Sequence, residues 1–175
     1  YQQLQMKPFA IKGVDGAWSF TSGPARFLIL DSRSYRETAL NAASHSILTE
    51  DQIQALETWL SDESADEMLN VISTGSVIAP GLSDHDSPMN PGRRDNFQSN
   101  RLDRDIIFSN LHNAKNIHSN MRFLLISGDY HVSAATRIVR DDETVGAAIV
   151  APPLYSPMPF MNASSHSLLL NEDLN

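Results

Sequence analysis

Two short runs of apolar residues, each ending abruptly in polar residues, place the strongest constraint on the fold of this chain. Residues 27–30 read Phe-Leu-Ile-Leu and residues 123–126 read Phe-Leu-Leu-Ile, without the alternation of a half-exposed strand. Such continuous runs are typical of strands that are buried on both faces. Asp31 directly follows the first run, and Asp129 follows the second after two residues. The sequence therefore predicts an α/β protein whose buried strands end near carboxylates.

A helix is predicted between these two runs. Thr49 and Gln52 have the spacing of a capping box, in which the Thr hydroxyl accepts a hydrogen bond from a free backbone N–H and the Gln side chain reaches back. Ile53, Leu56 and Leu60 follow at helical spacing and form one apolar face. This segment is therefore predicted to be an amphipathic helix.

The remaining elements alternate along the chain. Residues 69–74 are typical of a second strand, residues 100–116 of a second helix, and residues 136–140 and 145–150 of an antiparallel hairpin. This order predicts a mixed β-sheet flanked by helices. A length of 175 residues favours a single domain over residues 1–175. In such sheets, ligands bind outside the carboxyl ends of the strands.

Two segments lack a periodic pattern. The stretch before Gly23 is poorly patterned and carries no predicted strand. Residues 80–100 contain three prolines and two glycines. Because loops longer than about 12 to 15 residues are uncommon in compact domains, this segment is interpreted either as a lid over the site or as a surface excursion.

Composition and charge exclude several classes of function. The 13 Lys and Arg residues against 21 Asp and Glu residues give a net charge of −8, which argues against a nucleic-acid-binding patch. The chain has no cysteine, so any metal ligands must be oxygen or imidazole nitrogen atoms. No apolar run approaches the ~18 residues of a membrane span. A soluble chain without a targeting segment is expected, and its compartment stays open.

Asp129 and His131 form the sharpest chemical motif of the sequence. In extended backbone, residues two apart project to the same side, with Cβ atoms about 7 Å apart. A carboxylate and a neutral imidazole on one side suit a shared metal ion, and Gly128 permits a tight turn. The alternative is structural, with the aspartate capping a loop and the histidine bonded to backbone.

Three further segments carry residues of types that act in catalysis or ligand binding. Ser127 lacks the preceding glycine of a nucleophile elbow, so a serine hydrolase triad is disfavoured. Residues 84–86 read Asp-His-Asp, which is either a ligand cluster or a solvated loop. Arg33 follows a buried strand, where a guanidinium group grips an anionic ligand or pairs with Asp31.

Four segments in order resemble the alkaline-phosphatase-D-like (PhoD-like) metallophosphatases of the calcineurin-like metallophosphoesterase superfamily. They are residues 27–36 (FLILDSRSYR), 48–60 (LTEDQIQALETWL), 95–111 and 124–133 (LLISGDYHVS). They are similar to the family patterns F-x-x-L-D-T-R-S-Y-R, L-G-x-x-Q-x-x-W-L and L-S-G-D-x-H, and the third segment, with Phe97 at the usual Trp, matches more loosely. The resemblance covers about residues 26–140.

The resemblance implies one half of a four-layer αββα sandwich. The early Asp, G-D-x-x-D and G-N-H-D motifs, which supply most metal ligands in this superfamily, do not occur here. The chain therefore looks like the C-terminal half of the catalytic domain, which an N-terminal half or a partner chain would complete. The alternative is a non-catalytic binding or assembly domain derived from the same fold. Relatives are often exported.

The resemblance also implies a chemistry. Asp129 and His131 would be catalytic metal-site residues, and Arg33 would be at most a substrate-phosphate contact or a structural contact. The cofactors would be two divalent or trivalent metal ions, with Fe, Ca, Mn and Zn as candidates, and the substrate a phosphate ester attacked by a metal-activated water. The resemblance assigns no role to Asp31, Asp95, Arg101 or residues 84–86.

Overall fold

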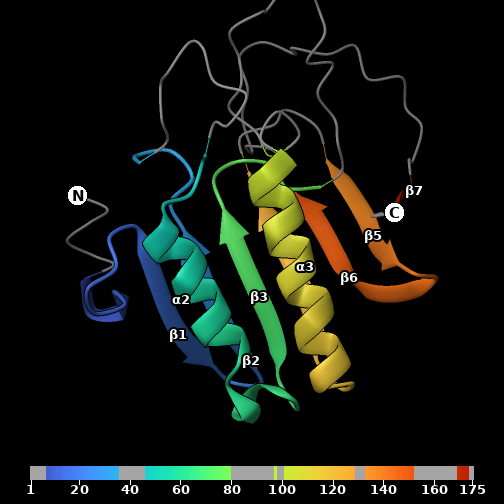
Figure 1. The fold of residues 1–175 in the computed structure, drawn as a ribbon, viewed down its shortest axis with the longest axis horizontal. Helices are drawn as coiled ribbons and strands as arrows, with labels where there is room; N and C mark the ends of the chain where they lie inside the picture. Colours follow the sequence, from blue (N-terminus) through green and yellow to red (C-terminus); the bar gives the residue numbers. More distant parts are fainter. Residues whose placement is uncertain are drawn as a thin grey trace, which may run out of the picture.

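The computed structural model describes residues 7–35, 46–79, 97, 101–128, 133–151 and 169–173. These residues form a seven-stranded sheet with two α-helices on one of its faces (Figure 1). The elements are η1 (Lys7–Phe9), β1 (Ala17–Ser22), β2 (Ala25–Leu30), α2 (Glu50–Leu60), η2 (Glu63–Ala65), β3 (Leu69–Thr74), α3 (Arg101–Ile117), β4 (Arg122–Ser127), β5 (Ala134–Arg140), β6 (Glu143–Val150) and β7 (Leu169–Asp173). Among them, no helix is long and apolar enough to span a membrane.

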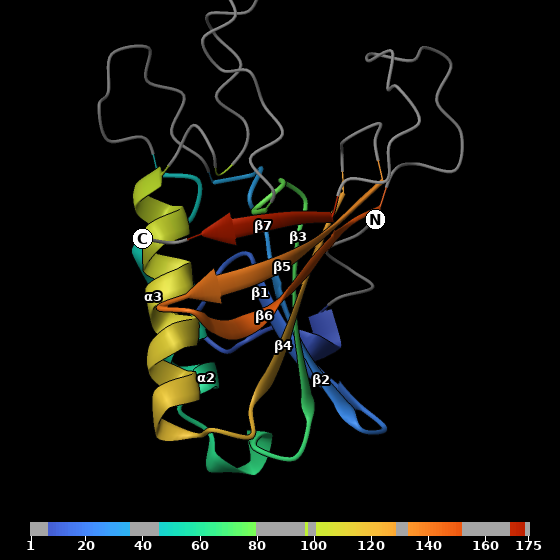
Figure 2. The ribbon, with the colours of Figure 1, turned by 90° about the vertical axis from the view of Figure 1, so that its right-hand side faces the viewer.

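The strand order is β1-β2-β3-β4-β6-β5-β7. Strands β2, β3, β4 and β6 run parallel to one another, whereas β1 is antiparallel to β2, and β5 is antiparallel to β6. Strand β7 is parallel to β5 (Figure 2). The prediction of an α/β fold with a mixed sheet flanked by helices is confirmed.

The strands and helices predicted from periodicity are present at the expected places. The predicted hairpin is also present, and Asp141 and Asp142 form its two-residue turn with φ angles of 51° and 62°. Positive φ at both turn positions matches the twist of an antiparallel pair, and Asp tolerates this conformation better than most residues.

Strands β1 and β7 were not predicted. In β1, Trp18 and Phe20 alternate with Ser19 and Thr21, which is the pattern of an edge strand with unequal faces. The alternation is visible in the sequence and ends close to a turn residue, Gly23. In the structure Gly23 has a φ of 55°. Strand β7 has the sequence LLNED, whose last three residue types are depleted in strands, so its propensity argues against a strand.

The core lies between the sheet and the two helices. Leu28, Ile72 and Leu125 lie side by side on neighbouring strands, and each is 0% exposed. Leu56 of α2 and Leu111 of α3 belong to the same cluster of buried residues and are equally inaccessible. Burying such side chains stabilises the fold by about 1.5 to 3 kcal/mol each.

The predicted capping box is present at the start of α2. Gln52 N–H donates to Thr49 Oγ1 at 3.2 Å, and Thr49 N–H donates to Gln52 Oε1 at 2.9 Å. The same Gln52 amide donates to the carbonyl oxygens of Gly16 at 2.8 Å and Asp31 at 3.1 Å. Gln52 is fully buried. One side chain therefore begins the helix and holds the end of β2.

A buried carboxylate joins the two helices. Asp103, near the start of α3, accepts hydrogen bonds from the backbone N–H groups of Ile47 and Leu48 and from the Ser46 hydroxyl. These residues directly precede the capping box of α2. Because the Asp103 side chain is buried and satisfied by these donors, it fixes the start of α2 against α3.

The amino end of the sheet contains a second polar cluster. The buried Arg26 guanidinium lies 3.9 Å from the centre of the Trp59 ring, is hydrogen-bonded to Asn70, and pairs with Asp62 at 3.4 Å. Burial lowers the pKa of Arg26, and the nearby charge of Asp62 opposes that shift. This cluster ties β2, β3 and α2 together at the end of the sheet opposite Asp31.

We expect Gln52→Ala to lower the free energy of unfolding by about 2 to 4 kcal/mol, because it removes the capping box and leaves buried backbone groups without their partners. Gln54→Ala is the matched control, since Gln54 is exposed on the same helix. It should change stability by less than about 0.5 kcal/mol. Urea unfolding of both variants checks this, and equal midpoints would contradict the assigned role of Gln52.

Candidate functional site

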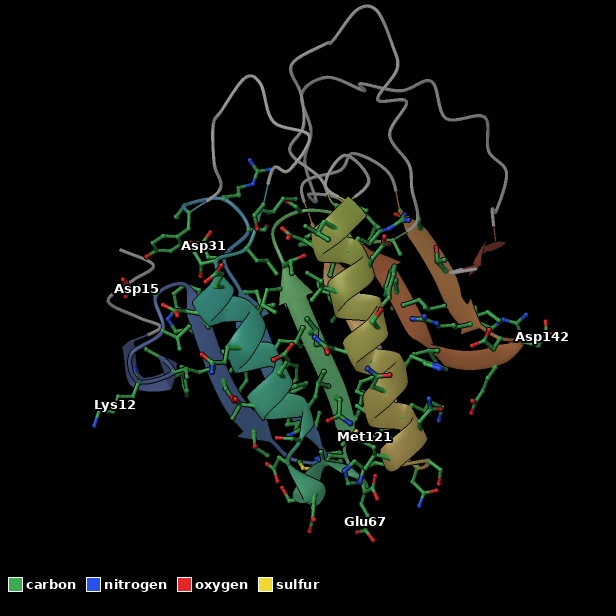
Figure 3. All side chains as sticks on the ribbon, in the orientation of Figure 1. Lys12, Asp15, Asp31, Glu67, Met121 and Asp142 are labelled. Carbon is green, nitrogen blue, oxygen red and sulfur yellow. The ribbon has the colours of Figure 1, made fainter. Side chains whose placement is uncertain are left out.

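The carboxyl ends of the central strands are aligned at one edge of the sheet. Leu30 of β2 pairs with Thr74 of β3, Thr74 pairs with Ser127 of β4, and Ser127 pairs with Val150 of β6. We call this line of residues, with the segments that follow it, the carboxyl edge. Figure 3 shows Asp31 at this edge, whereas Met121 and Glu67 lie at the opposite end of the molecule.

Buried hydroxyl groups connect the segments that leave this edge. Ser32 Oγ lies 3.0 Å from Ser76 Oγ and accepts from Ser76 N–H at 2.9 Å, which joins the residues after β2 to those after β3. Thr74 Oγ1 donates to Ser76 O at 2.6 Å. Ser127 Oγ accepts from Ile78 N–H at 3.4 Å, which connects β4 to the same segment. The carboxyl edge is therefore held as one unit.

Apart from Ser127, which was weighed as a nucleophile, these hydroxyl groups were not identified as candidates from the sequence. The available signal was their position, because each lies at or just beyond the end of a buried strand. Ser127 is 3% exposed and is bonded to backbone, so its hydroxyl does not face solvent as a nucleophile would. The expectation that Ser127 is not the nucleophile of a hydrolase triad stays a prediction.

Asp31 organises the turn that carries Arg33. Its Oδ1 atom accepts hydrogen bonds from the backbone N–H groups of Arg33 and Ser34, both at 2.9 Å. Burial raises the pKa of Asp31, but the hydrogen bonds from Ser34 and Arg33, with the charge of Arg33, lower it by more in sum. The pKa of Asp31 is therefore below its ordinary value of 3.8.

Arg33 lies at the carboxyl edge beside the end of β3. A Cβ atom built at Gly75 would be 3.7 Å from Arg33 Nε and 3.6 Å from Ser32 Oγ. The glycine thus leaves ordinary van der Waals room between the end of β3 and the segment after β2. A cation at this position is suited to an anionic ligand, and the predicted phosphate contact of Arg33 stays a prediction.

Asp129 and His131 lie outside the residues that the structure describes. Their flanking residues, however, are both at the carboxyl edge. Gly128 directly follows β4, and Ala134 at the start of β5 pairs with Val150, the partner of Ser127. A segment that leaves and returns at this edge carries the two predicted metal-site residues.

Residues 80–100 also lie outside the described part of the chain, except for Phe97. That residue is fully buried, and its N–H donates to Val77 O at 3.1 Å. Val77 follows β3 at the carboxyl edge, so Phe97, within the predicted lid, is held there. The Asp-His-Asp cluster at residues 84–86 and Asp95 fall within the undescribed part, and the lid interpretation stays a prediction.

Among the described residues, no group of three or more His, Asp or Glu side chains is arranged to hold a metal ion. Asp31 directly precedes Ser32 of the hydroxyl cluster, and its Oδ1 accepts hydrogen bonds from backbone N–H groups. A carboxylate and an imidazole, the side-chain groups of Asp129 and His131, suit Fe, Mn or Zn, and the metal-ligand role of these two residues stays a prediction.

An α/β sheet with polar segments gathered at the carboxyl ends of its parallel strands defines a class of protein that binds ligands at that edge. Comparison with known proteins identifies the family. The family model described as PhoD-like phosphatase matches residues 16–171. The chain therefore belongs to the PhoD-like phosphatase family, and the resemblance seen in its sequence is confirmed.

The fold is also similar to a solved structure. The protein described as "Structure of PhoD" matches with a TM-score of 0.59 and 22% sequence identity. The match covers 78% of this chain but 28% of that chain, so this chain spans less than a third of the length of that relative. The comparison with curated proteins gave no match.

The lowered pKa of Asp31 predicts a pH-dependent contribution to stability. Because the folded pKa lies below 3.8, the contribution is present above that pH and is lost as the pH falls through the folded value. Asp31→Asn should lower the melting temperature at pH 7, and the difference from wild type should shrink below pH 3.8.

Thermal unfolding between pH 2 and pH 7 measures this difference, with Asp142→Asn as a control in the exposed hairpin turn. A difference between Asp31→Asn and wild type that is constant over the whole range would show that the carboxylate charge does not stabilise the turn.

Proposed function

We propose that this chain supplies part of the active site of a metal-dependent phosphoric ester hydrolase, either a phosphatase or a phosphodiesterase. Membership of the PhoD-like phosphatase family supports a phosphatase-type function in general. The observation that carries the proposal is the alignment of Leu30, Thr74 and Ser127, which brings the segments after three buried strands to one edge. The motif with Asp129 and His131 begins two residues after that line.

In this proposal four residues of the chain have defined roles. Asp129 and His131 hold the metal ions, which supply an activated water when bound. Arg33 orients the phosphate ester by binding its anionic oxygens, because a planar guanidinium group donates two parallel hydrogen bonds. Asp31 keeps the turn of Arg33 in place through its bonds to backbone N–H groups.

Two ligands are too few for the complete centre. Hard or borderline divalent ions take about four to eight donors, depending on the metal. The solved PhoD extends well beyond the region that this chain matches. We propose that an N-terminal half of the domain, or a partner chain, supplies the remaining ligands.

The isolated 175-residue chain should therefore hydrolyse para-nitrophenyl phosphate negligibly in the presence of Mn²⁺, Fe²⁺, Zn²⁺ or Ca²⁺. Isothermal titration should show weak metal binding, because the donor set is incomplete. Robust turnover that a chelator abolishes would contradict this expectation. It would mean that a local group, such as the Asp-His-Asp cluster at residues 84–86, completes the site.

In the complete assembly, Asp129→Ala and His131→Ala should each reduce turnover by about 100-fold or more. Residues that bind the metal directly contribute at least as much to activity as the groups that hydrogen-bond to them. Both residues follow the apolar run at 123–126, so truncation should leave no core cavity and the melting temperature should stay near wild type. Asp105→Ala, an exposed position on α3, is the control.

Activity, metal content and thermal unfolding are measured on the same variants. Loss of activity together with bound metal, at an unchanged melting temperature, supports the proposal. Wild-type turnover and metal content in both variants would exclude these residues from the site. An assembly that folds but never hydrolyses a phosphate ester would favour a binding or assembly domain.

A further inference from the structure

A groove lies between the carboxyl-terminal ends of α2 and α3. Its volume is about 340 Å³, and its lining includes Leu60 and Ser61 at the end of α2, and Ala114 and Ile117 at the end of α3. Each helix returns from the carboxyl edge to the start of the next strand, so both helices end at the amino end of the sheet (Figure 1). We call this depression the helix groove. It is thus remote from the carboxyl edge and its candidate site.

The floor of the helix groove is apolar. Leu60 and Ala114 line the groove and are buried, so they lie at its bottom. Ile117, by contrast, is 75% exposed at the last position of α3. A single exposed isoleucine is ordinary on a protein surface. Beside a recess with an apolar floor, however, it extends the apolar area that a bound partner removes from water.

The rim of the helix groove is acidic. Glu57 and Glu63 both line the groove, and both are exposed. They belong to residues 50–67, which contain seven of the 21 Asp and Glu residues of the chain and none of its 13 Lys and Arg residues. The negative charge of the chain is therefore concentrated on the helix that forms one wall of the groove and on the segment that follows it.

Basic groups of α3 near the groove contact groups other than the two rim glutamates. Lys115 Nζ donates to two backbone carbonyl groups in the segment after α3. His118 also lines the groove, and its Nδ1 atom lies 3.6 Å from Asp66 Oδ1. The last turn of α2 has no basic residue, so the partial negative charge of its carbonyl end adds to the charge of the rim. The groove is therefore electrostatically suited to a cation.

We infer that the helix groove binds a basic segment of a partner protein, in which a Lys or Arg side chain lies next to an apolar side chain. The hydrocarbon stem of the basic side chain packs on Leu60 and Ala114, and its charged end reaches the carboxylates of Glu57 and Glu63. The neighbouring apolar side chain covers Ile117. Charge complementarity between this segment and the rim determines the choice of occupant. The inference does not depend on the proposed function, because the groove and the carboxyl edge lie at opposite ends of the sheet.

Other kinds of occupant fit the helix groove less well. Nucleic acids and anionic membrane surfaces carry the same sign of charge as its rim, so they are repelled. A metal ion needs more ligands than the rim offers, and the described part of the chain contains no group of three or more His, Asp or Glu side chains arranged to hold one. A second copy of this chain has the same net charge of −8, and a symmetric pair would bring two acidic rims together.

The test uses the full 175-residue chain and three short peptides with capped ends. The peptide KKLLKK has both features of the expected segment, KKSSKK lacks the apolar side chains, and SSLLSS lacks the cations. Changes in the amide NMR signals of the chain locate each peptide and give its affinity. We expect KKLLKK to perturb residues 57–63 and 110–118, which include the lining of the groove. It should bind at least about fivefold more tightly than either other peptide and should lose affinity as salt is added.

Matched variants test the contacts of the groove. The double variant Glu57→Gln with Glu63→Gln removes two charges from the rim, and Ile117→Ser removes the exposed apolar side chain. Glu50→Gln is the control, since Glu50 is an exposed carboxylate at the other end of α2. We expect each groove variant to weaken the binding of KKLLKK by at least about fivefold, and Glu50→Gln to leave the affinity near the wild-type value. Circular dichroism and thermal unfolding confirm that each variant is folded.

Four contrary results would overturn the inference. Two are equal affinity for KKLLKK and SSLLSS, and a loss of affinity with Glu50→Gln as large as with the double variant. The third is binding of phosphatidylglycerol vesicles that Ile117→Ser abolishes, which would assign the surface to a membrane. The fourth is a homodimer in sedimentation velocity that Ile117→Ser dissociates, which would assign it to a second copy. None of these measurements involves hydrolysis of a phosphate ester, so failure of the proposed function would leave the inference standing.

Discussion

The parallel alignment of β2, β3 and β4 is the constraint on which the rest of the structure depends. The backbone N–H and C=O groups of buried strands must pair with one another, because no water reaches them. In the register that results, Leu30, Thr74 and Ser127 lie side by side. The polar residues that follow cannot continue into the core, so they collect at one edge. The place of the candidate site is thus a consequence of how the core is packed.

Gln52 connects this edge to the helix layer. A capping box ordinarily satisfies only the start of its own helix, but here the same amide also binds the carbonyl oxygens of Gly16 and Asp31. Gly16 has a φ of 76°, and a Cβ atom there would lie 2.9 Å from the Gln52 amide nitrogen and 2.7 Å from the Tyr35 ring. The end of β2, which carries Asp31 into the site, is therefore fixed by the same contacts that stabilise α2.

Local rules account for the parts of the fold that were predicted from the sequence. The buried runs, the capping box and the hairpin are each determined by a few adjacent residues. Strand β7 depends on its pairing with β5, which overrides its weak propensity. The bond between Ser32 and Ser76 joins residues 44 positions apart, so periodicity cannot reveal it. The motif with Asp129 and His131 was recognisable because its spacing is local, whereas the groups that surround it depend on tertiary structure.

The sheet face opposite the helices borders the carboxyl edge. On that face, Ile29, Ser73 and Ile126 directly precede Leu30, Thr74 and Ser127 of the edge. Any layer that covers this row therefore also borders the segments that leave the strand ends. Ile29 and Ile126 are only partly buried there, although apolar area contributes about 25 cal/mol per Å² removed from water. One residue along each strand thus separates a largely apolar row from the polar segments of the edge.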